Sequence, residues 1–194
     1  MPKIIKTDRS NFESHFNEFI NDKNIKILLV RSYEHKDSIK ETFSSLINNS
    51  NMNTGIIKVR AMKNNHVIFN GIMSEKELKK MHQDDIVGND NLKVKFESKS
   101  YFEDVKNRYD FELFCPIESI LFDVKETNKL KDVLKKASAK TILITTNDYG
   151  RKPEQLLDVV DEVLILDTTE ERKNVEGFSI LKQRIIDRDG KLPY

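Results

Sequence analysis

The chain has 194 residues, of which 38% are hydrophobic and 34% are charged, and its formal net charge is +1. This length suits one α/β core better than two very small domains, and the composition is that of a soluble globular protein. A charge this small excludes an overall positive field that would attract nucleic acid, and no apolar run approaches the roughly 18 residues that a membrane helix needs.

The first half of the chain alternates between helical and strand-like patterns. Ser10-Asn-Phe-Glu13 has the spacing of a capping box, and three phenylalanines recur after Ser10 at helical spacing, so we predict a helix over 10–22. A strand over 25–31 and a helix over 36–49 follow. The remaining elements of this half are predicted strands over 54–62 and 66–72 and a helix from Ser74 to about Gln83.

The segment from Gln83 to Asn91 is polar and rich in turn-forming residues, which predicts a loop or a break between sub-domains. Otherwise we expect a single domain. Beyond the segment, the predicted elements are strand 92–98, helix 100–108, strands 110–114 and 117–125, helix 127–137, strand 141–145, helix 153–160, strand 162–166 and helix 169–187. This alternation predicts an α/β fold with a central mixed or mostly parallel sheet and helices on both faces.

The start of the chain lacks the apolar core of a signal peptide, which together with the absence of a membrane span predicts a cytoplasmic protein. Cys115 is the single cysteine, so an internal disulfide framework is excluded, and no Cys/His cluster has zinc spacing.

The most informative residues lie on the two strands predicted at 110–114 and 117–125. Period-two alternation places Asp123 and Lys125 on one face of the second strand, and Asp110 begins the first. Two carboxylates can bind Mg²⁺ through hard oxygen ligands, and a lysine beside the ion can orient an attacking water. The alternative for these residues is an ordinary salt bridge between Asp123 and Lys125 at the end of a strand.

An acidic residue, a short hairpin and an acidic-x-Lys triplet resemble the motif of the PD-(D/E)XK nuclease superfamily. Thr141–Thr146 and the elements after it are similar to the end of the Mrr-type restriction nucleases. By position, the resemblance implies that Asp110 and Asp123 bind the metal and that Lys125 is the catalytic lysine. It also makes Glu103, on the predicted 100–108 helix, the candidate for an additional acidic residue.

This resemblance covers about residues 100–167 and implies an Mg²⁺-dependent nucleic-acid hydrolase of restriction-nuclease type, working as a homodimer when both strands are cut. The sequence departs from the motif with Tyr109 before the first aspartate and with Asp123, rather than glutamate, before the lysine. Lysines gather at 93–99 and 129–140, and we use these clusters as supporting evidence for a nucleic-acid partner.

A second interpretation takes the same strands as a nucleotide-binding core. Ile25–Val30 would be its first strand, Ser119–Asp123 resembles a Walker B strand, and Thr141–Asn147 resembles the strand that ends in a polar sensor residue. The loop Arg31–Ser38 has no glycine, so backbone amides cannot approach a phosphate closely. This interpretation implies a non-catalytic nucleic-acid or protein-binding module with a degenerate P-loop NTPase-like core.

In that loop, Lys36 and Ser38 stand where the usual Lys-Ser/Thr pair would be, and they are the loop's only likeness to a Walker A motif. Ser32–Asp37 also resembles the opening of TIR domains, over six residues. NAD cleavage by such domains needs a glutamate on a later helix, and no position of this sequence is singled out for it.

Overall fold

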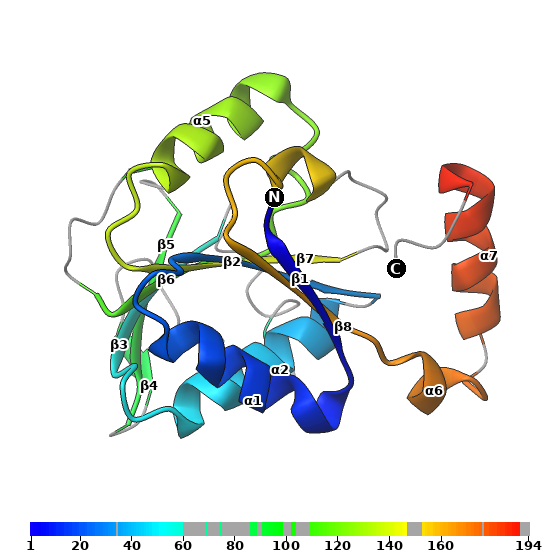
Figure 1. Cartoon of the computed structure of the whole chain (residues 1–194), viewed down its shortest axis with the longest axis horizontal. Coiled ribbons are helices and arrows are strands. Elements are labelled where there is room, and N and C mark those ends of the chain that lie inside the picture. Colours follow the sequence, from blue (N-terminus) through cyan, green and yellow to red (C-terminus); the bar gives the residue numbers. More distant parts are fainter. Residues whose placement is uncertain are drawn as a thin grey trace.

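The computed structural model describes residues 1–33, 35–59, 69, 74, 86–88, 91–98, 102–103, 109–146, 153–175 and 177–190. These residues form an eight-stranded sheet in the order β1-β8-β2-β7-β6-β3-β5-β4 (Figure 1). Neighbouring strands run parallel, except that β4 is antiparallel to β5 at one edge. The strands are β1 (Lys3–Thr7), β2 (Ile27–Ser32), β3 (Thr54–Lys58), β4 (Ile86–Gly88), β5 (Lys93–Glu97), β6 (Phe111–Phe114), β7 (Lys140–Thr146) and β8 (Glu162–Leu166).

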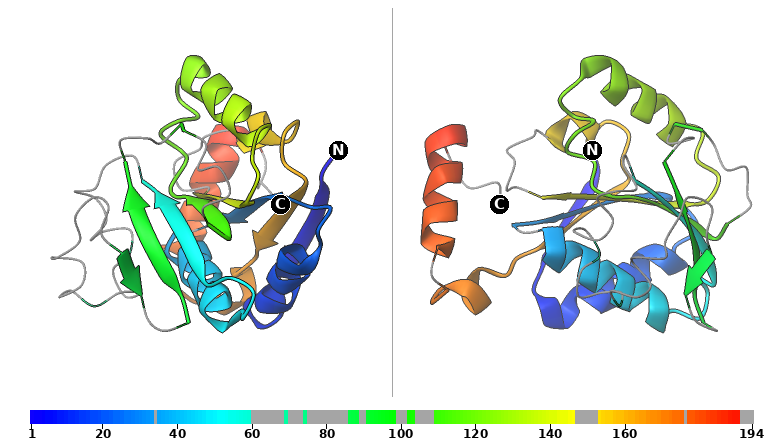
Figure 2. Two further views of the ribbon diagram at one scale, coloured as in Figure 1. Left: turned by 90° about the vertical axis from the view of Figure 1, so that its left-hand side faces the viewer. Right: turned by 180° about the vertical axis from the view of Figure 1, so that it is seen from behind.

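Helices cover both faces of this sheet, which confirms the predicted α/β fold. The helices α1 (Arg9–Asn21) and α2 (His35–Asn48) lie on one face, and α5 (Val124–Leu134) and the 3₁₀ helix η2 (Pro153–Leu156) lie on the other (Figure 1). Two more helices, α6 (Thr169–Arg172) and α7 (Phe178–Asp189), follow β8 and lie beyond the carboxyl ends of the strands (Figure 2). None of the helices in the described ranges combines the length and apolarity needed to cross a membrane.

The central strands are apolar because helices bury both of their sides. All six residues of β2 are buried, as expected for a parallel strand with a helix layer above and below. The phenylalanines of α1 (Phe12, Phe16 and Phe19) pack into the larger core between the sheet and the α1/α2 layer. Leu130 and Leu134 of α5 belong to the core on the opposite face.

Gly55 on β3 is required by the packing of its neighbour Phe111. The two residues are paired in the ladder between β3 and β6, and a Cβ at position 55 would lie 2.1 Å from the Phe111 ring. A larger residue at this position would displace a fully buried phenylalanine. The larger core therefore depends on the absence of a side chain here.

The N-cap of α1 lies two residues earlier than the capping-box spacing predicts. Asp8, rather than Ser10, is the N-cap, and its side chain accepts a hydrogen bond from the backbone N–H of Asn11 at 3.0 Å. In α2, Ile39, Phe43 and Leu46 are buried in the core, whereas Ile47, at helical spacing from Phe43, is 38% exposed.

Several other predicted elements differ from those in the structure or lie outside the described residues. β1 was absent from the prediction, and the predicted strand over 54–62 is described only as β3. The predicted 66–72 strand and the helix after Ser74 lie outside the described residues, apart from Phe69 and Ser74. The predicted 83–91 loop contains β4, which pairs with β5 in the same sheet. The predicted 169–187 helix is broken into α6 and α7, and Gly177 between them has a φ of 86°.

Candidate functional site at the carboxyl edge

Open α/β sheets bind ligands at the carboxyl ends of their strands, between neighbouring strands whose connections leave toward opposite faces. Here β2 leads into α2 on one face. Its neighbour β7 is followed, after residues 147–152 outside the described ranges, by η2 on the other face. The carboxyl edge at β2 is therefore where this fold offers a ligand site.

The connection from β2 to α2 is too short to surround a phosphate. β2 ends at Ser32 and α2 begins at His35, so only positions 33 and 34 separate them. The side chains of Ser32 and Tyr33 are buried rather than turned toward solvent. A phosphate-binding loop uses a longer, glycine-rich connection whose backbone N–H groups surround the phosphates. The described backbone at this position cannot form one.

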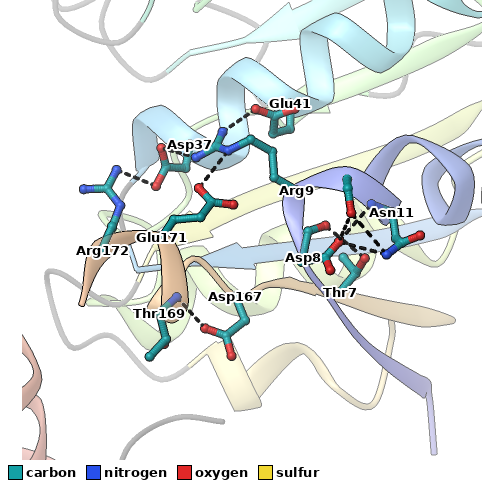
Figure 3. Close-up of polar contacts among 11 residues, drawn as sticks. Thr7, Asp8, Arg9, Asn11, Asp37, Glu41, Asp167, Thr169, Glu171 and Arg172 are labelled. Carbon is teal, nitrogen blue, oxygen red and sulfur yellow. Dashed lines mark hydrogen bonds and ion pairs between the residues drawn. The ribbon is translucent and has the colours of Figure 1, made fainter. Parts of the chain in front are cut away.

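The first turn of α2 instead carries its own carboxylate, Asp37, held between two arginines. Asp37 is buried, and its two carboxylate oxygens lie 3.3 Å from Arg9 Nη2 and 2.7 Å from Arg172 Nη2 (Figure 3). Arg9 comes from the start of α1 and Arg172 from the end of α6. A carboxylate near a helix N-terminus is favoured by the helix dipole, and two guanidinium groups add charge-assisted hydrogen bonds.

Arg9 connects Asp37 to two further carboxylates. Its guanidinium contacts Glu41 on α2 and donates to Glu171 of α6 at 3.1 Å (Figure 3). Burial alone would lower the pKa of Arg9, but the hydrogen bonds to Glu41, Glu171 and Asp37 outweigh it and raise the pKa. We call Arg9, Asp37, Glu41, Glu171 and Arg172 the edge cluster. It ties α1, α2 and α6 together at the carboxyl ends of β1, β2 and β8.

A second polar group lies beside the edge cluster, where β1 and β8 end. Lys6 Nζ is 2.8 Å from the carboxylate of Asp167, and the backbone N–H of Thr169 donates to that carboxylate at 2.9 Å. Burial raises the pKa of Asp167, but the hydrogen bonds from Lys6 and Thr169 outweigh it, so the pKa is lowered overall. The hydrogen bond to Asp167 raises the pKa of Lys6. Burial raises the pKa of the neighbouring Tyr33 hydroxyl.

The space between these two groups has an acidic lining. A cavity of about 450 Å³ lies elsewhere on α5, whereas the cavity here is smaller, about 270 Å³. Its walls are Lys6, Thr7, Asp8, Asp167, Glu170 and Glu171. Four carboxylates against one ammonium disfavour a phosphate, because like charges in a partly desolvated space repel. The described part of this edge therefore suits neither a nucleotide nor another polyanion.

Asp110, one of the predicted metal ligands, lies at the opposite, amino edge of the sheet. It precedes β6, and one of its oxygens accepts hydrogen bonds from the backbone N–H groups of Asn53 and Thr54 at 3.0 and 2.8 Å. The hydroxyl of Thr54 donates to the same oxygen at 3.0 Å. In this arrangement the carboxylate caps the start of β3 and joins it to β6.

The predicted strand over 117–125 is wrong, and with it the predicted strand pair. Asp123 is the N-cap of α5, where its Oδ1 accepts hydrogen bonds from the backbone N–H groups of Lys125 at 2.7 Å and Glu126 at 3.3 Å. Lys125 lies in the first turn of that helix, with an exposed side chain. Metal binding by Asp110 and Asp123 stays a prediction. The strand pair that was expected to bring the two carboxylates together is not formed, because Asp123 caps a helix.

A signal in the sequence could have identified this helix start. Asp123 followed by Glu126 three residues later has the spacing of a capping box ahead of an apolar periodic run. Ile117, Ile120 and Leu121 recur at turn or helix spacing, and all three pack into the core under α5. The apolar run before Asp123 belongs to a buried turn, so its residues resemble those of a strand by composition alone.

Glu103 contributes a backbone group rather than its side chain. Its carbonyl oxygen accepts a hydrogen bond from Lys58 Nζ, and its side chain is exposed. Lys58 is fully buried and also pairs with buried Glu112 at 3.3 Å. Phe102 and Glu103 are the described residues of the predicted 100–108 helix, and they form a turn and a bend. Although Glu103, Asp110 and Asp123 are all described, no three His, Cys, Asp or Glu side chains in the described ranges gather closely enough to hold a metal.

The predicted Walker B strand is also misplaced. Ser119–Phe122 form a turn, and the strand of the core in this part of the chain is β6. β6 ends in Phe114, followed by buried Cys115 rather than by an acidic residue. Burial and the nearby carboxylate of buried Glu118 raise the pKa of the Cys115 thiol, so Glu118 is the carboxylate on this side of the sheet. The predicted sensor strand is confirmed as a strand, since Lys140–Thr146 form β7 next to β2.

No protein-family model matches the chain, and no curated protein matches it either. Among solved structures, the chain is similar to domain III of the replication initiation protein DnaA from Thermotoga maritima, with a TM-score of 0.48 and 11% sequence identity. The similarity covers 97% of this chain and 72% of that chain. A likeness at this level carries no argument about ligand or activity.

Four members of the edge cluster were not predicted from the sequence: Arg9, Glu41, Glu171 and Arg172. Asp37 was noted only as part of the loop after the first core strand. Arg172 and Asp37 are 135 residues apart in the chain, and Arg9 and Asp37 are 28 apart. Charged residues are common throughout this sequence, so no local pattern distinguishes these from other surface charges.

Proposed function

We propose that this protein is a non-catalytic binding module built on a P-loop NTPase-like core, with a carboxyl edge that serves a structural purpose. The observation that carries the proposal is the Asp37 carboxylate between Arg9 and Arg172 in the first turn of α2. A P-loop protein presents its phosphate site at this helix start. Here the chain's own anion neutralises the cations that could otherwise bind a phosphate.

The strand order supports the P-loop-like description of the core. In chain order the five central strands are β2, β3, β6, β7 and β8, and across the sheet they run fifth, first, fourth, third, second. The strand that leads into α2 thus lies between two strands that come much later in the chain. This is the arrangement expected for a P-loop NTPase-like core, and it fits the second interpretation of the sequence.

The chemistry of the edge supports binding without nucleotide hydrolysis. The two-residue β2–α2 connection provides no phosphate loop, and the adjacent cavity is acidic. Among the described residues, an internal ion pair thus occupies the helix start that would hold a phosphate in a P-loop enzyme.

Nucleotide titration tests this proposal directly. Isothermal titration calorimetry with Mg²⁺-ATP and Mg²⁺-GTP should give no saturable heat, and neither nucleotide should raise the melting temperature or release phosphate above the buffer rate. A cooperative thermal transition of the same sample shows that the protein is folded. Saturable binding of either nucleotide, with a matching rise in melting temperature, would refute the proposal.

The nuclease hypothesis, with its Mg²⁺ cofactor, nucleic-acid substrate and homodimer, stays a prediction. A nicking assay on plasmid DNA with and without Mg²⁺ tests it, using Asp123→Ala and Lys125→Ala as variants. We expect no Mg²⁺-dependent nicking, because both residues belong to a helix start rather than to a strand pair. Cleavage by the wild type that both variants abolish would restore the nuclease assignment.

A further inference from the structure

The outer face of α5 carries cations that lack ion-pair partners in the described part of the chain. Of the five lysines on α5 and in the turn after it, Lys131 is paired, with its Nζ 2.7 Å from Asp158. The other four are exposed. Lys135 acts electrostatically on Asp158, and no ion pair with a described residue is formed by Lys125, Lys129 or Lys136. When an external anion binds such a lysine, no ion pair with a described residue has to be broken first.

Three of these lysines form a line along α5 and the turn after it. Positions 125 and 129 are four residues apart on the helix, so they fall on one side of the cylinder, and Lys136, two residues beyond the end of α5, lines the same groove as Lys129. At 1.5 Å per residue, Lys125 and Lys129 are about 6 Å apart along the axis, close enough to contact neighbouring phosphates of one nucleic-acid strand. Asp132 lies on the same side and partly offsets their charge.

A groove with an aromatic wall runs beside this line of lysines. Its volume is about 450 Å³, within the range of ligand-binding pockets, and Lys129 and Lys136 are among its lining residues. Phe102 and Val133 provide its apolar surface, and Asp132 completes the lining. Phe102 is half-buried and packs against the core under α5, which fixes the ring in place. An aromatic ring and two ammonium groups that line one groove can bind a stacked base and the phosphates next to it.

From this arrangement we infer that the α5 groove binds single-stranded nucleic acid. Base–aromatic stacking and lysine–phosphate attraction are the two interactions by which proteins bind single strands without sequence preference. A duplex could use the lysines but could not present a base to Phe102, and an acidic peptide has no planar base to stack. The groove lies on the α5 face rather than at the carboxyl edge, so the inference does not depend on whether that edge binds nucleotide.

Fluorescence anisotropy with a labelled oligothymidylate of about 15 nucleotides tests the inference, at salt from about 50 to about 200 mM. Lys125→Glu/Lys129→Glu should weaken binding at least about tenfold and reduce the slope of log K against log salt by about 1.4, which is about 0.7 for each lost phosphate contact. Both substitutions are on exposed positions of a helix, and glutamate near the start of α5 is favoured by its dipole.

The matched control is Lys36→Glu/Lys40→Glu on α2, on the opposite face of the sheet. These lysines are also exposed and four residues apart, and the variant changes the net charge by the same amount. Its affinity should stay within about twofold of the wild type. Equal weakening by both double variants would show attraction to overall charge and would overturn the assignment of a site.

Phe102→Leu tests the stacking contact while keeping an apolar side chain against the core. We expect the affinity for oligothymidylate to fall at least about fivefold, with the salt slope unchanged, because stacking releases no counterions. The wild type should bind poly-glutamate and duplex DNA more weakly than the single strand. The inference fails if the wild type does not bind the single strand, if it binds poly-glutamate equally well, or if Phe102→Leu has no effect.

Discussion

The two edges of the sheet use charged residues in different ways. At the amino edge, carboxylates bind backbone N–H groups: Asp110 accepts from Asn53 and Thr54, and Asp161 accepts from Lys26 and Ile27 at 2.8 and 2.9 Å. At the carboxyl edge, charged side chains bind one another in the edge cluster.

The difference shows that the amino edge is organised for strand alignment, while the carboxyl edge joins helices from distant parts of the chain. Backbone contacts at the amino edge fix where neighbouring strands begin, and each involves residues of adjacent strands. Ion pairs at the carboxyl edge depend on three helices keeping their positions, so the edge cluster should be more sensitive to salt.

Asp37→Ala should have the largest effect. It removes the shared partner of Arg9 and Arg172 and leaves two guanidinium groups close together, which we expect to lower the free energy of unfolding by about 2–3 kcal/mol. Urea denaturation measures this loss, and Asp37→Asn serves as the control that keeps the shape. The loss should shrink in about 1 M salt, where the Debye length is about 3 Å. A loss that does not depend on salt would contradict the electrostatic account.

Asp110→Ala should cost about 1–2 kcal/mol, because the N–H groups of Asn53 and Thr54 and the Thr54 hydroxyl lose one common acceptor. Asp161→Ala removes an equivalent contact at β2 and β8 and should cost a similar amount. Asp110→Asn keeps a carbonyl acceptor and should cost less. Since we assign Asp110 a structural role, Mg²⁺ should not shift the unfolding midpoint of the wild type. A midpoint that rises with Mg²⁺ and loses this response in Asp110→Ala would favour the nuclease assignment instead.

Glu162→Gln should raise the stability at neutral pH by about 0.5–1 kcal/mol. Burial raises the pKa of Glu162 above its ordinary value of 4.5, although Lys3, 3.6 Å away, opposes the shift. Between the ordinary and the raised pKa the folded protein binds more protons than the unfolded chain, so the free energy of unfolding falls as pH rises. The advantage of the variant should therefore disappear below about pH 4.5. A constant difference across this range would assign the effect to packing.

Asp167→Asn should have the smallest effect, about 0.5 kcal/mol, because Lys6 is half exposed and solvent screens the pair. The hydrogen bonds from Lys6 and Thr169 lower the pKa of Asp167, so its contribution is present above about pH 3.8 and is lost as pH falls through the lowered pKa. Acid titration of wild type and variant, followed by circular dichroism, should converge at low pH. Curves that move apart as the pH falls would contradict a stabilising contribution from ionised Asp167.

Much of the fold follows from local patterns in the sequence. The phenylalanines of α1 recur at helical spacing, and the apolar runs of β2, β7 and β8 are continuous because both sides are buried. These patterns were enough to predict helices on both faces of a mostly parallel sheet. They failed at 117–125, where a buried turn and a helix cap share the composition of a strand, and at β1, a short edge strand with two lysines.

The sequence by itself determined the alternation of helix and strand, because side-chain spacing decides which surface of each element is apolar. Only the tertiary structure decided which charges meet. Asp37 finds Arg172 because the sheet order places β8 beside β2, although the two strands are far apart in the chain. Tertiary structure also decided which groups Asp110 contacts. Its position in the sequence suited a metal ligand, but the start of β3 provides the backbone N–H groups that its carboxylate binds.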